Sequence, residues 1–261
     1  MDRNGADTPD QPAQCDLEIA RGLLLAVATI AVAGFALADS RGAGISRMSG
    51  EIFTAPALLA IAGCQLRDAV FTPSHTRFFR ALIPWVACGA TATLVAALFG
   101  VGAYGDGRAG LARCAPALQL ALLPAIYAAA ARAMRGGKLL LPGVAVLAHI
   151  AGATFGFPSL SAFVFFLMGV GLAGRRTEFS RLIARQPYLA AAAGPFAFAL
   201  TLIACARVGP AGEGASVADI GPIALALGLS AGPAVLASAS ALTANAAGDA
   251  FRRLGRAAPA A

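Results

Sequence analysis

A single histidine within an apolar stretch is the clearest candidate for chemistry. His149 stands in the run 147–150, among leucine, alanine and isoleucine. An ionisable side chain in such a run is costly in a membrane and marks a candidate functional site, and imidazole can accept or donate a proton. His149 is therefore the candidate catalytic residue. The alternative is a neutral imidazole hydrogen-bonded to a neighbouring helix, with Gln119 and Thr154 as candidate partners.

A short basic and aromatic segment is the second candidate site. Residues 71–80 read Phe-Thr-Pro-Ser-His-Thr-Arg-Phe-Phe-Arg, which places Arg77 and Arg80 shortly before Pro84 and Trp85. Arginine pairs with carboxylate or phosphate through two parallel hydrogen bonds, so both arginines are candidate ligands for acyl-CoA or a lipid phosphate. The alternative is the positive charge and aromatic belt found at many membrane borders.

The composition predicts a scaffold that is solvated by lipid. The 261 residues are 58% hydrophobic and 13% charged, whereas soluble domains carry roughly 25% charged residues. Lipid offers no hydrogen-bond partner to free backbone groups, so long apolar runs predict helices. We therefore expect an all-α protein, a polytopic transmembrane helix bundle. The many glycines and alanines favour close helix packing.

Apolar runs divide the chain into eight predicted spans. They are 19–38, 51–66, 79–103, 111–131, 138–156, 158–174, 187–206 and 219–247. The second and sixth are short, with Pro56 and Pro158 near their starts, so each is either a full crossing or a tilted or re-entrant segment. The count is seven or eight. Residues 1–18 are predicted to be a disordered cytoplasmic tail, 19–250 the bundle, and 251–261 a short basic cytoplasmic tail.

Lysine and arginine are shared unequally between alternate loops. The side rich in them normally stays cytoplasmic. Most of the 20 fall at one set of span ends: Arg3, Arg21, Arg67, Arg77, Arg80, Arg132, Arg135, Lys138, Arg175, Arg176, Arg181, Arg185, Arg252, Arg253 and Arg256. The opposite loops hold only Arg41, Arg47, Arg108, Arg113 and Arg207. Eight spans with both termini in the cytoplasm satisfy the rule at every loop.

Several classes of protein are disfavoured. The net charge of +7 is accounted for by these loops, so we expect no nucleic-acid partner. The five cysteines are scattered, without metal spacing, and no nucleotide-binding motif is present, so neither a metal nor a bound cofactor is expected. The first run ends in Ala36-Leu37-Ala38, which resembles a signal-peptidase site. An uncleaved helix is favoured over a cleaved signal because the leading tail is acidic.

Four stretches of the chain occur in an order that resembles a known family. They are Ile19-Ala20-Arg21-Gly22-Leu23; Phe53 with Leu59-Ala60-Ile61-Ala62-Gly63 and Leu66-Arg67; Arg77-Phe78-Phe79-Arg80 with Pro84; and Phe157-Pro158 with Phe163 to Gly169, followed by Arg175-Arg176. In this order they resemble the membrane acyltransferases often called acyltransferase 3, whose relatives acylate periplasmic glucans. The resemblance covers most of the chain.

The resemblance implies an acyl transfer across the membrane. An acyl donor such as acyl-CoA would be a co-substrate held at the cytoplasmic side near Arg77 and Arg80. The acceptor would be a hydroxyl of an envelope glycan or lipid, and His149 would be the base that removes its proton. Helical spans of this kind imply a multi-pass protein of the bacterial inner membrane.

Two departures from the family favour a second hypothesis. Members carry a histidine about three turns after the Arg-Gly-Leu, where this chain has Ile30, Ala31, Val32 and Ala33. They also have about ten spans, two more than predicted here. A catalytically degenerate relative is one interpretation. The alternative class is a noncatalytic membrane subunit, scaffold or passive permease, in which His149 is a packing residue.

Overall fold

Every regular element in the described part of the chain is a helix. The computed structural model describes residues 17–24, 26, 45, 48–87, 123–134, 140–155, 158–208, 221–243 and 246–257. The labelled elements are η1 (Gly50–Thr54), α3 (Ala55–Phe71), α6 (Leu140–Phe155), α7 (Pro158–Gly174), α8 (Arg176–Arg185), α9 (Pro187–Val208), α10 (Gly221–Leu242) and α11 (Ala246–Ala257). Residues 17–24, 75–87 and 123–133 are also helical. The predicted all-α class is confirmed for these ranges.

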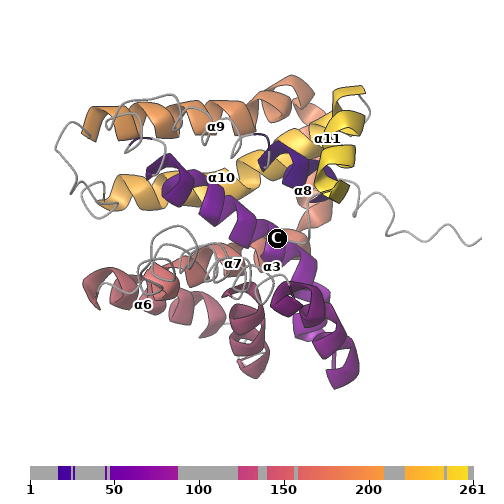
Figure 1. Ribbon diagram of the computed structural model, residues 1–261, viewed down its shortest axis with the longest axis vertical. Helices are drawn as coiled ribbons and strands as arrows, with labels where there is room; N and C mark the ends of the chain where they lie inside the picture. The colour runs from indigo at the N-terminus through magenta and orange to yellow at the C-terminus, as the bar shows by residue number, and fades with distance from the viewer. Residues whose placement is uncertain are drawn as a thin grey trace, which may run out of the picture.

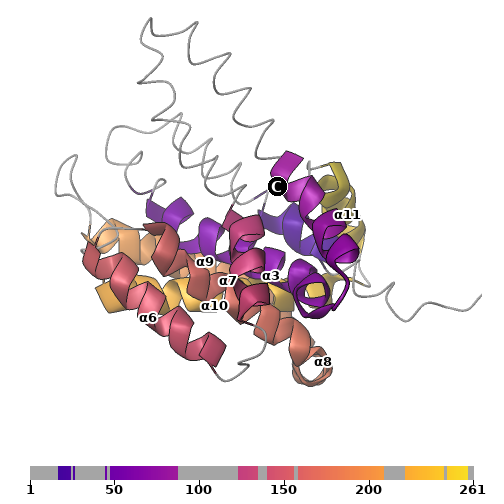
Figure 2. The ribbon, with the colours of Figure 1, turned by 90° about the horizontal axis from the view of Figure 1, so that it is seen from below.

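The central helix is α3. It packs against α7 on one side and α10 on the other, with α6 against α7 and α9 against α10 (Figures 1 and 2). Leu59 and Leu66 of α3 belong to a hydrophobic cluster shared with α6, α7 and helices 75–87 and 123–133, whereas Ala57 and Ile61 belong to a second cluster with α9 and α10. Because α3 is apolar on both faces, both can be buried.

The contact between α3 and α7 is made by small residues. A Cβ atom at Gly63 would meet the carbonyl oxygen of Phe166, and one at Gly169 would meet the carbonyl oxygen of Ala60. The thiol of Cys64 donates a hydrogen bond to the carbonyl oxygen of Gly169 at 3.1 Å. Only residues without a side chain allow two helix backbones to approach this closely. The two glycines therefore fix the distance between the helices.

Side-chain hydrogen bonds connect α9 and α10 next to a proline in α9. Pro195 lies inside α9 and lacks an amide hydrogen, so the carbonyl of Ala191, four residues earlier, loses its intrahelical donor. The hydroxyl of Ser238 in α10 shares its hydrogen between that carbonyl, at 2.9 Å, and the carbonyl of Ala190, at 3.1 Å. The same oxygen accepts a hydrogen bond from the amide of Gly194 at 2.8 Å. The side chain of Ser238 thus supplies hydrogen bonds to backbone groups of α9 around the proline.

Several predicted spans coincide with helices. The described helices α6, α7 and α9 follow the predicted runs 138–156, 158–174 and 187–206. Among the described residues, two stretches, Pro187–Arg207 and Ile223–Leu242, are long and apolar enough to cross a membrane, and Pro142–Gly152 and Ala162–Gly174 are shorter apolar helices. The number of spans and their orientation remain predictions. The tail 1–16, the signal-peptidase resemblance at 36–38 and most of the first, third and fourth runs lie outside the described residues.

The structure differs from the predicted boundaries after α7 and after α10, and α3 continues to Phe71, beyond the predicted run 51–66. The last run, 219–247, divides after Leu242, and α11 begins at Ala246 and covers most of the stretch predicted as a tail. The basic segment after α7, predicted as a loop, forms α8. Both new helices are amphipathic and carry several arginines. Average hydropathy identifies apolar runs, so it does not distinguish a charged amphipathic helix from a loop.

Candidate anion-binding site at the basic end

Several arginine-rich segments meet at one end of the molecule, which we call the basic end. The side chain of Arg67, near the end of α3, lies beside Gly174 at the end of α7. Arg256 of α11 forms an ion pair with Glu18 in helix 17–24, with a nitrogen–oxygen distance of 2.9 Å. Helix α8 contacts α10, and Figures 1 and 2 place α8 and α11 at this same end.

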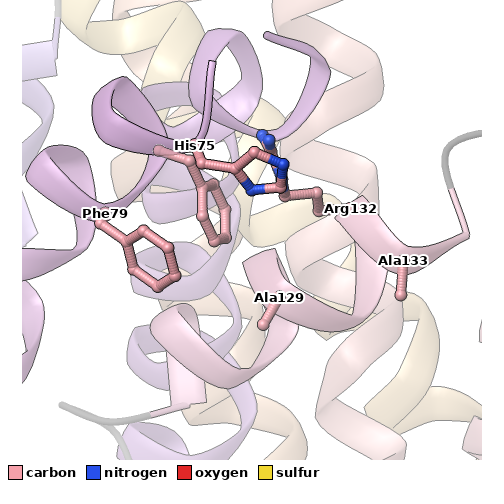
Figure 3. A pocket seen from close by; sticks show the side chains of 6 residues that line it. His75, Phe79, Ala129, Arg132 and Ala133 are labelled. Carbon is pink, nitrogen blue, oxygen red and sulfur yellow. The ribbon is translucent and has the colours of Figure 1, made fainter. Parts of the chain in front are cut away.

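A shallow open depression of about 440 Å³ lies at the end of α3. Helix 75–87 and helix 123–133 line it with His75, Phe78, Phe79, Ala129, Arg132 and Ala133 (Figure 3). His75 and Phe79 are exposed, whereas Phe78 and Arg132 are buried. The depression therefore combines an imidazole and a guanidinium with aromatic surface.

Arg132 is held by the end of α3. It is 9% exposed, and its guanidinium donates hydrogen bonds to the carbonyl oxygens of Ala69 at 3.2 Å, Thr72 at 2.8 Å and Pro73 at 3.2 Å. It also lies over the ring of Phe78, 4.5 Å from the centroid. The last carbonyls of a helix lack intrahelical donors and favour a positive charge. Arg132 supplies hydrogen-bond donors and a positive charge to these carbonyls. It also fixes helix 123–133 to the end of α3.

The predicted ligands Arg77 and Arg80 lie on another face of the same helix. Both are exposed, and neither lines the depression. The helix starts after Ser74, whose side-chain oxygen accepts a hydrogen bond from the Arg77 amide at 3.3 Å. With 3.6 residues per turn, positions 75, 78 and 79 share one face, and positions 77 and 80 share another. The structure thus brings Arg132, and not Arg77 or Arg80, next to His75.

The predicted catalytic residue, His149, lies in α6 and is partly buried. The depression takes none of its lining residues from α6, so His149 is not part of it. The hydroxyl of Thr154, a predicted partner of His149, donates to the carbonyl of Ile150 in its own helix at 2.8 Å. Gln119, the other predicted partner, lies outside the described residues.

The arginine of the Arg-Gly-Leu stretch has a packing role. Arg21 donates a hydrogen bond to the side-chain oxygen of Gln65 in α3 at 2.6 Å. A Cβ atom at Gly22 would meet the carbonyl oxygen of Phe251, and one at Gly255 would meet that of Glu18. Helix 17–24 is therefore held between α3 and α11.

Sequence reasoning did not identify Arg132 as a site residue. The sequence marks it only as one of several loop arginines, because its carbonyl partners lie about sixty positions earlier. His75, which lines the same depression, lies within the predicted basic segment 71–80. Within the ranges that the structure describes, no cluster of three or more His, Cys, Asp or Glu side chains could hold a metal ion.

The chain was compared with protein-family models, with curated proteins and with solved structures, and none of the three comparisons found a match. The site's own chemistry therefore decides which function to propose. The exposed imidazole of His75 and ring of Phe79, close to the buried positive charge of Arg132, suit a ligand that joins an anionic group to an apolar one.

Proposed function

We propose that this chain is a multi-pass protein of the bacterial inner membrane that binds an acyl donor such as acyl-CoA at its cytoplasmic basic end and passes the acyl group to an envelope glycan or lipid. The observation that carries the proposal is the depression between His75 and Arg132. Two of its lining residues, Phe78 and Phe79, belong to the stretch that resembles acyltransferase 3 proteins. The exposed imidazole and aromatic ring, with the positive charge of Arg132 close by, fit a donor with phosphates and an apolar chain.

The contacts at the basic end support the proposed topology. Eight crossings would bring the loops after the second, fourth and sixth spans, together with both chain ends, to one side of the membrane. Arg132 joins the second of these loops to the first through Thr72. The ion pair between Glu18 and Arg256 joins the two chain ends. This arrangement is expected of an even number of crossings with basic loops in the cytoplasm.

The proposed reaction needs a group that moves a proton. The acceptor hydroxyl would attack the thioester carbonyl, a new C–O bond would replace the C–S bond, and the hydroxyl proton would pass through a base to the departing thiolate. The chain has two histidines. His75 belongs to the depression, so we assign it to donor binding, and His149 is the proposed base.

The test is an acylation profile of envelope glycans and lipids from cells that lack the protein, carry it, or carry His149→Ala. Loss of the same ester in the deletion and in the variant supports acyl transfer with His149 as base. Loss in the deletion alone removes His149 from the mechanism. An unchanged profile in the deletion contradicts the proposal.

Donor binding is tested separately with purified protein and a fluorescent acyl-CoA. His75→Ala is expected to weaken binding by about tenfold, equivalent to ~1.4 kcal/mol. The control is Arg207→Ala, which removes an exposed arginine in the last turn of α9 and should leave binding unchanged. Equal effects of the two substitutions would contradict a site at the depression.

A noncatalytic membrane subunit or scaffold is the second candidate function. The observation that favours it is the separation of His149 from the depression, since α6 supplies none of its lining. Normal donor binding without any change in acylation on deletion would decide for this candidate.

A further inference from the structure

Helix α8 has an apolar stripe that the bundle covers only in part. The stripe consists of Phe179, Leu182 and Ile183, which fall on one face because they are three and four residues apart. Phe179 and Ile183 are partly buried, and Phe179 packs against the cluster around α10. Leu182 is 63% exposed, and no residue of α8 is fully buried.

The apolar surface continues past the end of α8. At the start of α9, Tyr188 is 89% exposed and Leu189 is 66% exposed. Arginine surrounds this surface: Arg175 precedes α8, and Arg181 and Arg185 lie on its polar face and are exposed. A surface with exposed leucines and a tyrosine beside several arginines matches the boundary between acyl chains and anionic headgroups.

The position of α8 agrees with such a boundary. It connects α7 to α9, and α9 contains one of the two stretches that, among the described residues, are long and apolar enough to cross a membrane. Figure 1 shows α8 running across the ends of α9 and α10, not along them. If α9 and α10 cross the bilayer, a helix with this direction lies in the plane of its surface.

We propose that α8 lies in the cytoplasmic interface of the membrane and binds anionic phospholipid headgroups, such as those of phosphatidylglycerol, through Arg181 and Arg185. Leu182, Tyr188 and Leu189 enter the upper part of the acyl region. This inference rests on the membrane embedding in the proposed function, and its experiment tests the two separately.

The first measurement places single tryptophans by quenching in vesicles of brominated lipid. Trp85 is the chain's one tryptophan, so both probes use full-length protein with Trp85→Phe. Leu182→Trp reports on α8. Phe196→Trp, at a 64% exposed position inside α9, reports on embedding itself. Both probe positions are exposed, so neither new tryptophan fills a buried site. Trp85 is buried, so a melting curve of the Trp85→Phe background first checks that this protein is folded.

The expected result is strong quenching of the α8 probe by lipids brominated near the glycerol end, and of the α9 probe by lipids brominated deep in the chain. Quenching of the α9 probe alone overturns the inference about α8 and leaves the membrane protein standing. Deep quenching of the α8 probe also overturns it. Absence of quenching at both positions overturns the embedding as well.

The second measurement tests the lipid charge. Full-length protein is reconstituted in phosphatidylcholine with and without phosphatidylglycerol, and its melting temperature is measured. Arg185→Glu and Arg207→Glu make the same charge change, the first at the end of α8 and the second in the last turn of α9. We expect phosphatidylglycerol to raise the melting temperature of the wild type and of Arg207→Glu. It should not raise the melting temperature of Arg185→Glu. An equal response of both variants overturns headgroup binding at α8.

Discussion

The hydroxyl of Ser238 in α10 donates a hydrogen bond to the carbonyl oxygen of Ala191 in α9 at 2.9 Å. This carbonyl has no intrahelical hydrogen-bond donor, because Pro195, four residues later, has no amide hydrogen. A residue that looks like an ordinary small helix-packing side chain in sequence therefore completes the backbone of another helix.

Replacing Ser238 with alanine should destabilise the protein by roughly 1–2 kcal/mol, because it leaves buried backbone groups of α9 without partners. The measurement is equilibrium unfolding in mixed detergent micelles. The matched control is Ser230→Ala in the same helix, where the exposed hydroxyl bonds only to Leu227 of its own helix. Equal stability of the two variants would contradict the role assigned to Ser238.

Alanine at Gly169 should destabilise the protein strongly, by ~2 kcal/mol or more, because its Cβ would overlap the backbone of α3. Gly171 provides the control two residues away in α7, since a Cβ there meets open space. Gly171→Ala should be neutral or slightly stabilising through helix propensity. The same unfolding assay compares the two, and a Gly169→Ala variant as stable as Gly171→Ala would refute the close crossing.

Arg132→Ala should lower the free energy of unfolding by about 2–3 kcal/mol, because three carbonyls at the end of α3 lose a charged hydrogen-bond donor. Arg80→Ala, which removes an exposed arginine from a neighbouring helix, should change stability by less than about 0.5 kcal/mol. Thermal unfolding in detergent measures both. A small effect at position 132 would show that water replaces the guanidinium there.

A reporter fused after Arg256 should be active on the cytoplasmic side, and one inserted after Arg207 should be active on the opposite side. The prediction follows from the unequal distribution of arginine between alternate loops. Paired reporters that work only in the cytoplasm or only outside it provide the measurement. If both fusions were active on the same side, the prediction that α10 crosses the membrane would be wrong.

Long apolar runs were the most predictable part of the fold. The helices α6, α7 and α9 follow runs of leucine, alanine and phenylalanine, because a long apolar segment away from water satisfies its backbone hydrogen bonds within a helix. Helices α8 and α11 were missed, since their stability comes from one apolar stripe and from contacts such as that of Gly255 with Glu18. The contact of Gly255 with Glu18 joins distant positions and leaves no local pattern, whereas the apolar stripe of α8 is a local pattern that average hydropathy does not reveal.

The candidate site was only partly predictable for the same reason. The segment 71–80 drew attention through its own arginines, yet the guanidinium that lines the depression comes from Arg132. Helical periodicity could have separated the face of His75 from that of Arg77 and Arg80 once the start of the helix at Ser74 was known. Nothing in the sequence specifies that the end of α3 would contact helix 123–133.

The contact of helix 17–24 with α11 has a consequence for biosynthesis. Gly22 and Gly255 bring the two helices into backbone contact, so a helix made early in translation packs against one made much later. While the intervening residues are being translated, helix 17–24 lacks this part of its packing surface. This contact therefore forms only after α11 has been made, and a chain stalled before α11 should be more open to degradation.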